Sequence, residues 1–260
     1  MNTQLDFIIG FNSGQRRKTI LRINKFLAQA GVASRRQADC LVQEGRVRIN
    51  GQLVTRLGIK VDENKDRIEV DGRPISLSAD QVYLLLNKPP GYIVTADDPQ
   101  KRKTVMELIP RLPFRIFPVG RLDSESEGAL LFTNDGVLAN RLLHPRYRIS
   151  KIYEVKVAGL VEDKALEKLK KGMFVDGRKT IPAKVKVIYR RKENSLLWLE
   201  IYEGRKHEIR KMFYSLGFEV KKLRRTSIAG ISIKGLRLGG WRYLKPEEIK
   251  KLKKLTSISD

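Results

Sequence analysis

The stretch that decides the fold runs from Val119 to Gly136 and reads VGRLDSESEGALLFTNDG. Apolar runs on either side of its polar centre favour two strands joined by a turn. The turn carries one carboxylate, Asp123, between an arginine and a run of small and acidic residues. Side chains on such a turn are held by a rigid scaffold and can reach a substrate. Asp123 is therefore the leading candidate for a catalytic group.

Asp123 also has a plainer interpretation, as a helix N-cap or a turn former. Ser124 and Glu127 stand three residues apart, which is the spacing of a capping box. Tyr153 fits ordinary strand packing, and Arg210 fits a solvated helix face. Taken one at a time, these residues do not establish a catalytic site.

Residues 82–254 predict one large domain around this stretch. Its opening run, Val82–Leu86, is continuously apolar and suits a buried strand. Further strands are expected around 116–119, 130–132, 152–157, 183–189, 196–202 and 220–225. Helices are expected over 105–109, 135–143 and 162–171, within the stretch from 203 that ends near Gly217, and at the lysine-rich C-terminus. Strands outnumber helices and do not alternate with them, which indicates a mixed α+β domain with a mainly antiparallel sheet.

A smaller module is expected before it, over residues 19–75. Two helices are predicted, one from Ile23 to Ala30 and one after an N-cap at Ser34. Strands around 47–49, 53–54 and 67–70 follow, with an Asn-Gly turn between the first two. Residues 1–18 are expected to form a flexible basic tail, and residues 76–81 a linker.

The composition favours a nucleic-acid partner. The 260 residues include 53 Lys or Arg and 29 Asp or Glu, a formal net charge of +24. Each phosphate that such a protein neutralises releases counterions, so polyphosphates bind it well. The segment 205–254 alone holds 16 Lys or Arg and 4 Asp or Glu, half of the net charge.

Other function classes find little support in the sequence. A single cysteine, Cys40, which we expect to be a buried helix residue, excludes an internal disulfide framework and a cysteine zinc site. Two histidines are too few for a histidine metal centre. No apolar run approaches the ~18 residues of a membrane span, so we expect a cytoplasmic protein without a membrane partner.

The N-terminal module resembles the alpha-L RNA-binding module found in ribosomal protein S-four. The resemblance lies in INKFL at 23–27, GVASRRQA at 31–38 and GRVRING at 45–51. It implies that Arg35 and Arg36 approach an RNA backbone. From charge alone, a generic solvated helix face is an equally good interpretation of these arginines.

The larger domain resembles the RsuA/RluB-type pseudouridine synthases. The matching motifs, in family order, are LNKPxG at 86–91, GRLD at 120–123 with GxLLxTNDG at 128–136, KxYxV at 151–155, EGRxHxIRxM at 203–212 and LxRxxIxG at 223–230. Ala129, where a leucine is common in the family, and the extra N-terminal tail are minor departures.

The resemblance implies that the chain isomerises uridine to pseudouridine in RNA, with no cofactor and no metal. It implies Asp123 as the essential carboxylate, acting either as a nucleophile on the ribose or as a base that removes a sugar proton. Arg210 is expected to pair with Asp123 and keep it ionised. Tyr153 is expected to stack on the extruded uracil, and Arg121, Leu122 and Leu223 to line the pocket.

The expected partner is ribosomal RNA or a pre-ribosomal particle, bound by a monomer. Candidate phosphate contacts besides the arginines of the N-terminal module are Lys88, Arg205, Lys206, Lys211, Arg224 and Arg225. NRLLHP at 140–145 and VDE at 61–63 look more like the members that act on the large subunit; the small-subunit alternative stays open.

Two other hypotheses remain open at this point. A non-catalytic ribosome-assembly or RNA-binding factor would account for the charge and the N-terminal module. A DNA-binding protein is the weaker alternative, because the sequence shows no recognition helix of the kind that reads a DNA half-site.

Overall fold

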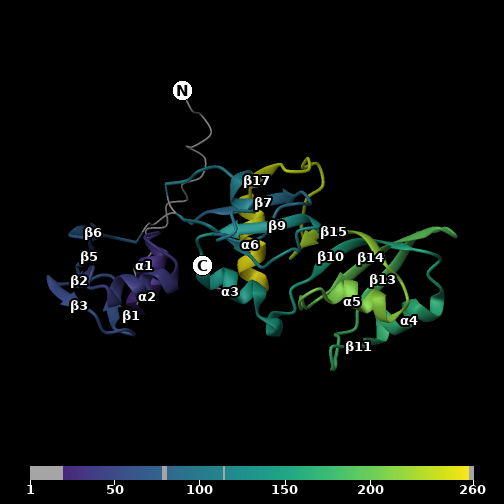
Figure 1. Ribbon diagram of the computed structural model, residues 1–260, viewed down its shortest axis with the longest axis horizontal. Coiled ribbons are helices and arrows are strands. Elements are labelled where there is room, and N and C mark those ends of the chain that lie inside the picture. The colour runs from purple at the N-terminus through teal and green to yellow at the C-terminus, as the bar shows by residue number, and fades with distance from the viewer. Residues whose placement is uncertain (1–19, 78–80, 114, 258–260) are drawn as a thin grey trace. The chain divides into compact units, whose positions relative to one another are not determined.

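The computed structural model describes residues 20–77, 81–113 and 115–257. They form two compact units, each with its own hydrophobic core (Figure 1). The first unit runs to Gln81 and also takes in Leu112–Ile116, and the second comprises Val82–Arg111 and the chain from Phe117 onward. The predicted tail lies outside the described residues, as do residues 78–80 of the predicted linker. The predicted domain boundaries stay predictions.

The first unit packs two helices against short strands. Its elements are β1 (Ile20–Arg22), α1 (Ile23–Gln29), α2 (Arg35–Gln43), β2 (Val47–Ile49), β3 (Gln52–Val54), β4 (Lys60–Asp62), β5 (Ile68–Val70) and β6 (Arg73–Ile75). One sheet has the order β3-β2-β5-β6, and β1 pairs with β4. All these pairings are antiparallel.

Helix α2 begins where the sequence predicts. The Ser34 hydroxyl accepts a hydrogen bond from the Gln37 backbone N–H, and the Gln37 side chain accepts one from the Ser34 N–H. Ala38 and Val42 face the core, one helical turn apart. Cys40 lies between them on the opposite side of the helix and is exposed, so the expectation that it is buried is wrong.

The second unit is built around one large sheet. Its strands are β7 (Tyr83–Lys88), β8 (Phe117–Val119), β9 (Glu127–Thr133), β10 (Lys151–Ala158), β11 (Phe174–Val175), β12 (Arg178–Lys179), β13 (Lys184–Arg190), β14 (Asn194–Ile201), β15 (Val220–Ile228), β16 (Ile231–Ser232) and β17 (Trp241–Tyr243). Its helices are the 3-10 helices η1 (Val105–Leu108) and η2 (Pro145–Tyr147) and the α-helices α3 (Gly136–Leu143), α4 (Asp163–Lys171), α5 (Glu208–Ser215) and α6 (Pro246–Leu255).

The main sheet has the strand order β13-β14-β10-β15-β9-β7-β17, with β8 added to β9 and β16 to β15. Among the described residues, β9 and β15 form the one parallel pairing of this sheet, and its other pairings are antiparallel. The predicted α+β class with a mixed, mainly antiparallel sheet is confirmed. The strands that the sequence pattern missed, such as β11, β12, β16 and β17, have two or three residues, too few to show a periodicity.

Two helices close the core of the β7–β9 half of the sheet. Leu138 and Leu142 of α3 and Leu252 of α6 pack in one cluster with Leu85 of β7 and Leu131 of β9. Helix α5 buries its apolar side toward the other half of the sheet and contacts β15. Figure 1 shows α4 and α5 beside the strands β10, β13 and β14. The centre of the sheet, where β9, β15 and β10 lie side by side, is left to carry the site.

Candidate active site

A row of residues crosses the centre of the sheet. Lys88 on β7 stands opposite Gly128 on β9, which stands beside Arg225 on β15, which stands opposite Tyr153 on β10. A bulge interrupts the β10–β15 pairing between Ile152 and Tyr153, and such bulges often re-aim side chains next to active sites. Four motifs that lie far apart in the sequence therefore meet in one row.

Gly128 lets β9 and β15 approach closely. Its φ of +113° lies in a region that side-chain-bearing residues rarely adopt. A Cβ atom placed here would lie 2.1 Å from the Arg225 carbonyl oxygen. The parallel pairing that positions Arg225 thus requires glycine at this position.

The turn before β9 carries Asp123 and is not a helix start. The Ser126 N–H donates to the Asp123 carbonyl oxygen at 3.0 Å, and strand β9 begins at the next residue, Glu127. The helix-cap interpretation of Asp123 is therefore excluded, and with it a capping box of Ser124 and Glu127. The Asp123 side chain is 35 % exposed, so a solute can reach it.

A buried lysine, Lys88, binds the backbone of this turn. The Lys88 ammonium donates to the carbonyl oxygens of Pro89, Asp123, Ser124 and Ser126 at 2.8–3.2 Å. Burial lowers the Lys88 pKa to about 8, and the Asp123 charge opposes that shift, so the side chain stays protonated at neutral pH. Because Lys88 is fully buried, its predicted role as an RNA phosphate contact is wrong; it positions the turn instead.

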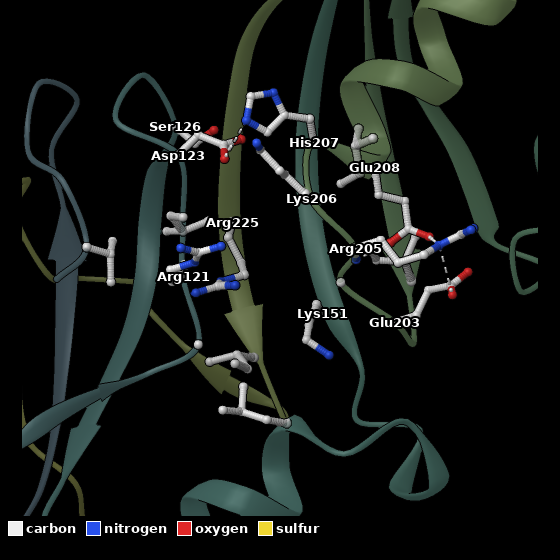
Figure 2. Close-up of a pocket in the computed structure, with 18 of the residues that line it drawn as sticks. Arg121, Asp123, Ser126, Lys151, Glu203, Arg205, Lys206, His207, Glu208 and Arg225 are labelled. Carbon is white, nitrogen blue, oxygen red and sulfur yellow. Dashed lines mark hydrogen bonds and ion pairs between the residues drawn. The ribbon is translucent and has the colours of Figure 1, made fainter. Parts of the chain in front are cut away.

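A cleft of about 1220 Å³ opens beside the turn (Figure 2). Asp123 lies at its edge, and Tyr153, Leu223 and Arg225 lie along the sheet beneath it. Tyr153 is 6 % exposed, and its hydroxyl lies 3.5 Å from Arg225 Nη1. Arg225 also donates from Nε to the Ala129 carbonyl oxygen at 2.7 Å. The cleft thus has an apolar, aromatic floor and a carboxylate at one wall.

His207 is the side chain with a recorded contact to the Asp123 carboxylate among the described residues. Its Nε2 atom lies 3.4 Å from Asp123 Oδ1, and its backbone is left-handed with a φ of +56° (Figure 2). The predicted Asp123–Arg210 pair is absent from the described contacts. Arg210 instead lies 3.5 Å from Glu125 and donates to the Val220 carbonyl oxygen at 3.1 Å. Arg210 comes three residues after His207. Its side chain therefore contacts Glu125, two residues after Asp123 in the same turn.

The opposite wall is a loop, Glu203–His207, held by a second buried ionisable group. Glu208 accepts from the Arg205 backbone N–H and from Arg205 Nε, both at 3.1 Å. Burial is the main cause that raises the Glu208 pKa, to about 7, and a hydrogen bond with Glu203 raises it further. Figure 2 shows Glu203, Arg205 and Glu208 gathered on this side of the cleft. Arg205 therefore contacts two carboxylates, Glu203 at 3.4 Å and Glu208 at 3.1 Å, and its predicted phosphate contact stays a prediction.

Lys151 is a cleft residue that the sequence pattern did not single out. Its Nζ donates to the Ile149 carbonyl oxygen at 3.0 Å, and its side chain is buried. Burial, together with the Arg225 charge, lowers its pKa to about 8. Lys151 is the first residue of the KxYxV motif, and this motif is the feature of the sequence that could have identified it as a cleft residue.

The other predicted residues divide between cleft and surface. Arg121 and Leu122 line the cleft with Leu223, as expected for the substrate pocket. Arg225 is 3 % exposed, so it belongs to the cleft and not to an outer phosphate-binding surface. The remaining predicted RNA contacts are not buried: Arg35, Arg36, Lys206, Lys211 and Arg224.

Two of those surface residues already have ionic partners. Lys211 pairs with Asp176, and Arg224 lies 3.6 Å from both Glu127 and Glu154. Within the described ranges, no group of three or more His, Cys, Asp or Glu side chains is placed to hold a metal ion. None of the described helices combines the length and the apolarity that crossing a membrane requires.

Comparisons with known proteins match both units. The family model for RNA pseudouridylate synthase matches residues 82–215, and that for the S4 domain matches residues 21–67. The chain is 44% identical over 236 residues to the ribosomal large subunit pseudouridine synthase B of Bacillus subtilis (strain 168), covering 90% of this chain and 96% of the relative. It is 43% identical over 239 residues to an uncharacterized RNA pseudouridine synthase of Aquifex aeolicus (strain VF5), covering 92% and 96%.

A solved structure agrees with these matches. The crystal structure of a pseudouridylate synthase superposes with a TM-score of 0.65 at 30% identity, covering 89% of this chain and 99% of that one. Fold, cleft and relatives define an RNA-modifying isomerase with an RNA-binding module. The chain belongs to the RNA pseudouridylate synthase family. Both resemblances seen in the sequence are confirmed.

Proposed function

We propose that this enzyme converts a specific uridine of large-subunit ribosomal RNA to pseudouridine, with Asp123 as the catalytic carboxylate. The observation that carries the proposal is the position of Asp123, partly exposed at the wall of the 1220 Å³ cleft above Tyr153. The large-subunit target is supported by the name of the Bacillus subtilis relative, a ribosomal large subunit pseudouridine synthase, which aligns over 96% of its length.

The reaction is an isomerisation that balances without a co-reactant. The bond from ribose C1′ to uracil N1 breaks, the uracil turns, and C1′ bonds to uracil C5. The proton on C5 is lost and N1 gains one. Asp123 serves this sequence either by attacking the ribose or by removing a sugar proton. Both roles need an ionised carboxylate within reach of the sugar, at a turn that does not move.

The cleft floor suits the uracil ring. Tyr153 presents a largely buried ring whose hydroxyl is held near Arg225, so it can stack without reorganising. Leu223, on the same face of β15 as Arg225, completes an apolar surface. Arg210 is retained in the proposal as a cleft residue: through Glu125 it supports the turn that carries Asp123.

The target nucleotide has to leave its stack to enter the cleft. Extrusion costs a few kcal/mol, which contacts to the RNA backbone must offset. Lys206, exposed on the loop that also carries His207, is a candidate for such a contact. In the first unit, Arg35 and Arg36 at the exposed start of α2 are further candidates. We further infer that the enzyme acts as a monomer in the cytoplasm on rRNA or a pre-ribosomal particle.

Tritium release from ribosomal RNA labelled at uracil C5 tests the proposal directly. Wild-type enzyme should release tritium, and Asp123→Asn should release none above background while keeping the wild-type thermal unfolding profile. Glu193→Gln, which alters an exposed carboxylate outside the cleft lining, is the matched control and should behave as wild type. Undiminished release by Asp123→Asn would remove Asp123 from the mechanism.

The target itself is tested by mapping pseudouridines in both rRNAs of cells that lack the gene. We expect one or more sites to be lost from the large-subunit RNA and to return with a plasmid copy. If pseudouridines are lost from the small-subunit RNA alone, the target is small-subunit and not large-subunit RNA. Assembly defects rescued equally by wild type and Asp123→Asn would favour the assembly-factor alternative.

A further inference from the structure

A second hollow of about 560 Å³ adjoins the catalytic cleft along the outer side of α5. We call it the α5 hollow; the residues that matter below are His207, Arg210, Lys211, Tyr214, Phe218 and Lys221. Glu125, His207 and Arg210 line both the α5 hollow and the cleft. The boundary between the two spaces is thus formed by the His207–Asp123 and Arg210–Glu125 contacts, and a chain leaving the cleft across it enters the hollow.

One face of α5 explains the chemistry of the hollow. The helix turns its apolar side to the sheet and buries it. Positions 210, 211 and 214 follow the i, i+1, i+4 spacing of one helical face, and His207 stands just before the first residue of the helix. That face carries an arginine, a lysine and a tyrosine. Cations and an aromatic ring are therefore presented together beside the proposed catalytic site.

Tyr214 is unusually open for an aromatic residue. Its side chain is 83% exposed, although tyrosine normally buries most of its ring, and Phe218 lines the same hollow. An exposed ring next to basic groups is the arrangement with which proteins bind single-stranded nucleic acid, because every base has a face that can stack. The ring in the α5 hollow therefore has the properties of a base-stacking platform.

The cations of the hollow are paired with exchangeable partners. Arg210 lies 3.5 Å from Glu125, Lys221 lies 2.6 Å from Glu219, and Lys211 pairs with Asp176. All three carboxylates are well exposed, and exposed pairs contribute little to stability. Phosphate oxygens can take the place of these carboxylates and form charge-assisted hydrogen bonds with the same cations.

We propose that the α5 hollow binds a nucleotide adjacent to the target uridine, with its base on Tyr214 and its phosphate on Lys211 or Lys221. The proposal rests on the proposed function, because that places the target uridine in the adjoining cleft. A smaller hollow of about 300 Å³ on the other side of the loop has no aromatic residue in its lining, so the α5 hollow is the better site for a base. Continuity with the cleft favours RNA over a protein ligand.

The first test is a kinetic comparison on a synthetic RNA hairpin that carries the mapped uridine. Tyr214→Ala should raise KM roughly tenfold or more, the size of a lost base–aromatic stack, with little change in kcat. Tyr214→Phe keeps the ring and should restore the wild-type KM. Phe174→Ala, which removes another exposed aromatic side chain from outside the hollow, is the matched control and should leave KM unchanged.

A second arm asks which base the ring contacts. Replacing the nucleotide on either side of the target by an abasic one should raise the wild-type KM at one of the two positions. At that position the penalty should disappear in Tyr214→Ala, because the two changes remove the same contact. A penalty of equal size in both proteins at both positions would overturn the assignment of the ring to a flanking base.

Charge is tested separately from stacking. The logarithm of KM should rise less steeply with the logarithm of salt for Lys221→Gln, by a slope change of about one, the value for one lost phosphate contact. Tyr214→Ala should keep the wild-type slope. An unchanged slope in Lys221→Gln and in Lys211→Gln would remove the phosphate from the proposal.

Failure of the proposed function is distinguishable from failure of the α5 hollow. Fluorescence anisotropy with a labelled oligouridylate reports binding by the full chain without turnover. If the enzyme converts no uridine, the proposed function fails, yet weaker oligouridylate binding by Tyr214→Ala still supports the hollow. If turnover is normal and Tyr214→Ala matches wild type in both KM and oligouridylate affinity, the α5 hollow is not an RNA subsite, and a protein ligand becomes the alternative.

Discussion

The turn that carries Asp123 and the loop that carries His207 face each other across the cleft, and each is held by a buried ionisable group (Figure 2). Under the turn, the Lys88 ammonium donates to four backbone carbonyls. Under the loop, the Glu208 carboxylate binds one backbone N–H and the side chain of Arg205. The Asp123 turn is therefore held through its backbone carbonyls, and the His207 loop is held largely through the side-chain contact between Glu208 and Arg205.

The two groups also differ in how they respond to pH. The pKa of Lys88 falls to about 8, so the ammonium and its hydrogen bonds persist at neutral pH. The pKa of Glu208 rises to about 7, so its charge changes within the physiological range. The comparison teaches that the Asp123 turn is held by a cation that is mostly protonated at neutral pH, whereas the opposite loop is held by a carboxyl group whose charge changes near neutrality.

The largest effect is expected where the turn enters the sheet, at Gly128. Gly128→Ala places a Cβ 2.1 Å from a backbone oxygen, so β9 and β15 must separate, and we expect a loss of about 4 kcal/mol or more in unfolding free energy. Gly159→Ala is the matched control: its φ is +81°, but no atom lies within 4 Å of the new Cβ. It should lose only about 1 kcal/mol, the cost of the backbone conformation. Urea unfolding measures both, and equal losses would mean that close strand approach is unimportant.

Lys88→Met is expected to come next. It removes the Lys88 donor from four carbonyl oxygens, of which those of Asp123 and Ser124 keep a backbone N–H donor, so we expect a cost of about 2 kcal/mol and a less firmly held turn. A displacement of about 1 Å at the reacting group lowers turnover about 100-fold. Lys164→Met, at an exposed position of α4, is the control and should keep wild-type stability and activity. Full activity in Lys88→Met would show that the turn holds its shape without the lysine.

The pH dependence of stability tests the other wall. The native state keeps the Glu208 proton up to about pH 7, whereas the unfolded chain releases it near pH 4.5. Unfolding free energy should therefore fall as pH rises from about 4.5 to about 7, by about 3 kcal/mol from this group. Urea titrations across that range should show the fall in wild type and a flatter profile in Glu208→Gln. Glu193→Gln, the exposed control, should keep the wild-type slope; a wild-type slope in Glu208→Gln would assign the titration to another group.

The smallest effect is expected at the contact between the walls. The His207–Asp123 pair is 3.4 Å long and both side chains are partly exposed, so it contributes at most about 1 kcal/mol. His207→Gln should change single-turnover rates by less than about fivefold. A loss as large as that of Asp123→Asn would place the histidine among the reacting groups, together with Asp123.

Local signals in the sequence predict local structure well. Ser34 is predicted as a helix cap, and the structure gives it the reciprocal contacts of a capping box with Gln37. The strand–turn–strand interpretation of Val119–Gly136 is likewise correct, because it depends on apolar runs and a polar turn that are neighbours in the chain.

Contacts between distant segments account for what the sequence could not predict. The acceptors of Lys88 in the aspartate turn lie 35–38 residues away in the chain, so the lysine looked like a surface cation. Whether Arg210 or His207 reaches Asp123 depends on where α5 begins and on the left-handed backbone of His207, neither of which a motif specifies. The family resemblance predicted which residues line the cleft. Which side chain contacts Asp123 could be determined only from the structure.

The cross-strand row of Lys88, Gly128, Arg225 and Tyr153 has a consequence for how such enzymes can diversify. A strand cannot slip by one residue without turning its side chains to the other face of the sheet, so these four can only be inherited together. Lys211 and Tyr214 on the outer face of α5 are under no such constraint, because neither has a recorded contact with a residue of the row. Target choice can therefore be re-engineered by grafting that helix face from a relative, while the reaction itself stays with the sheet.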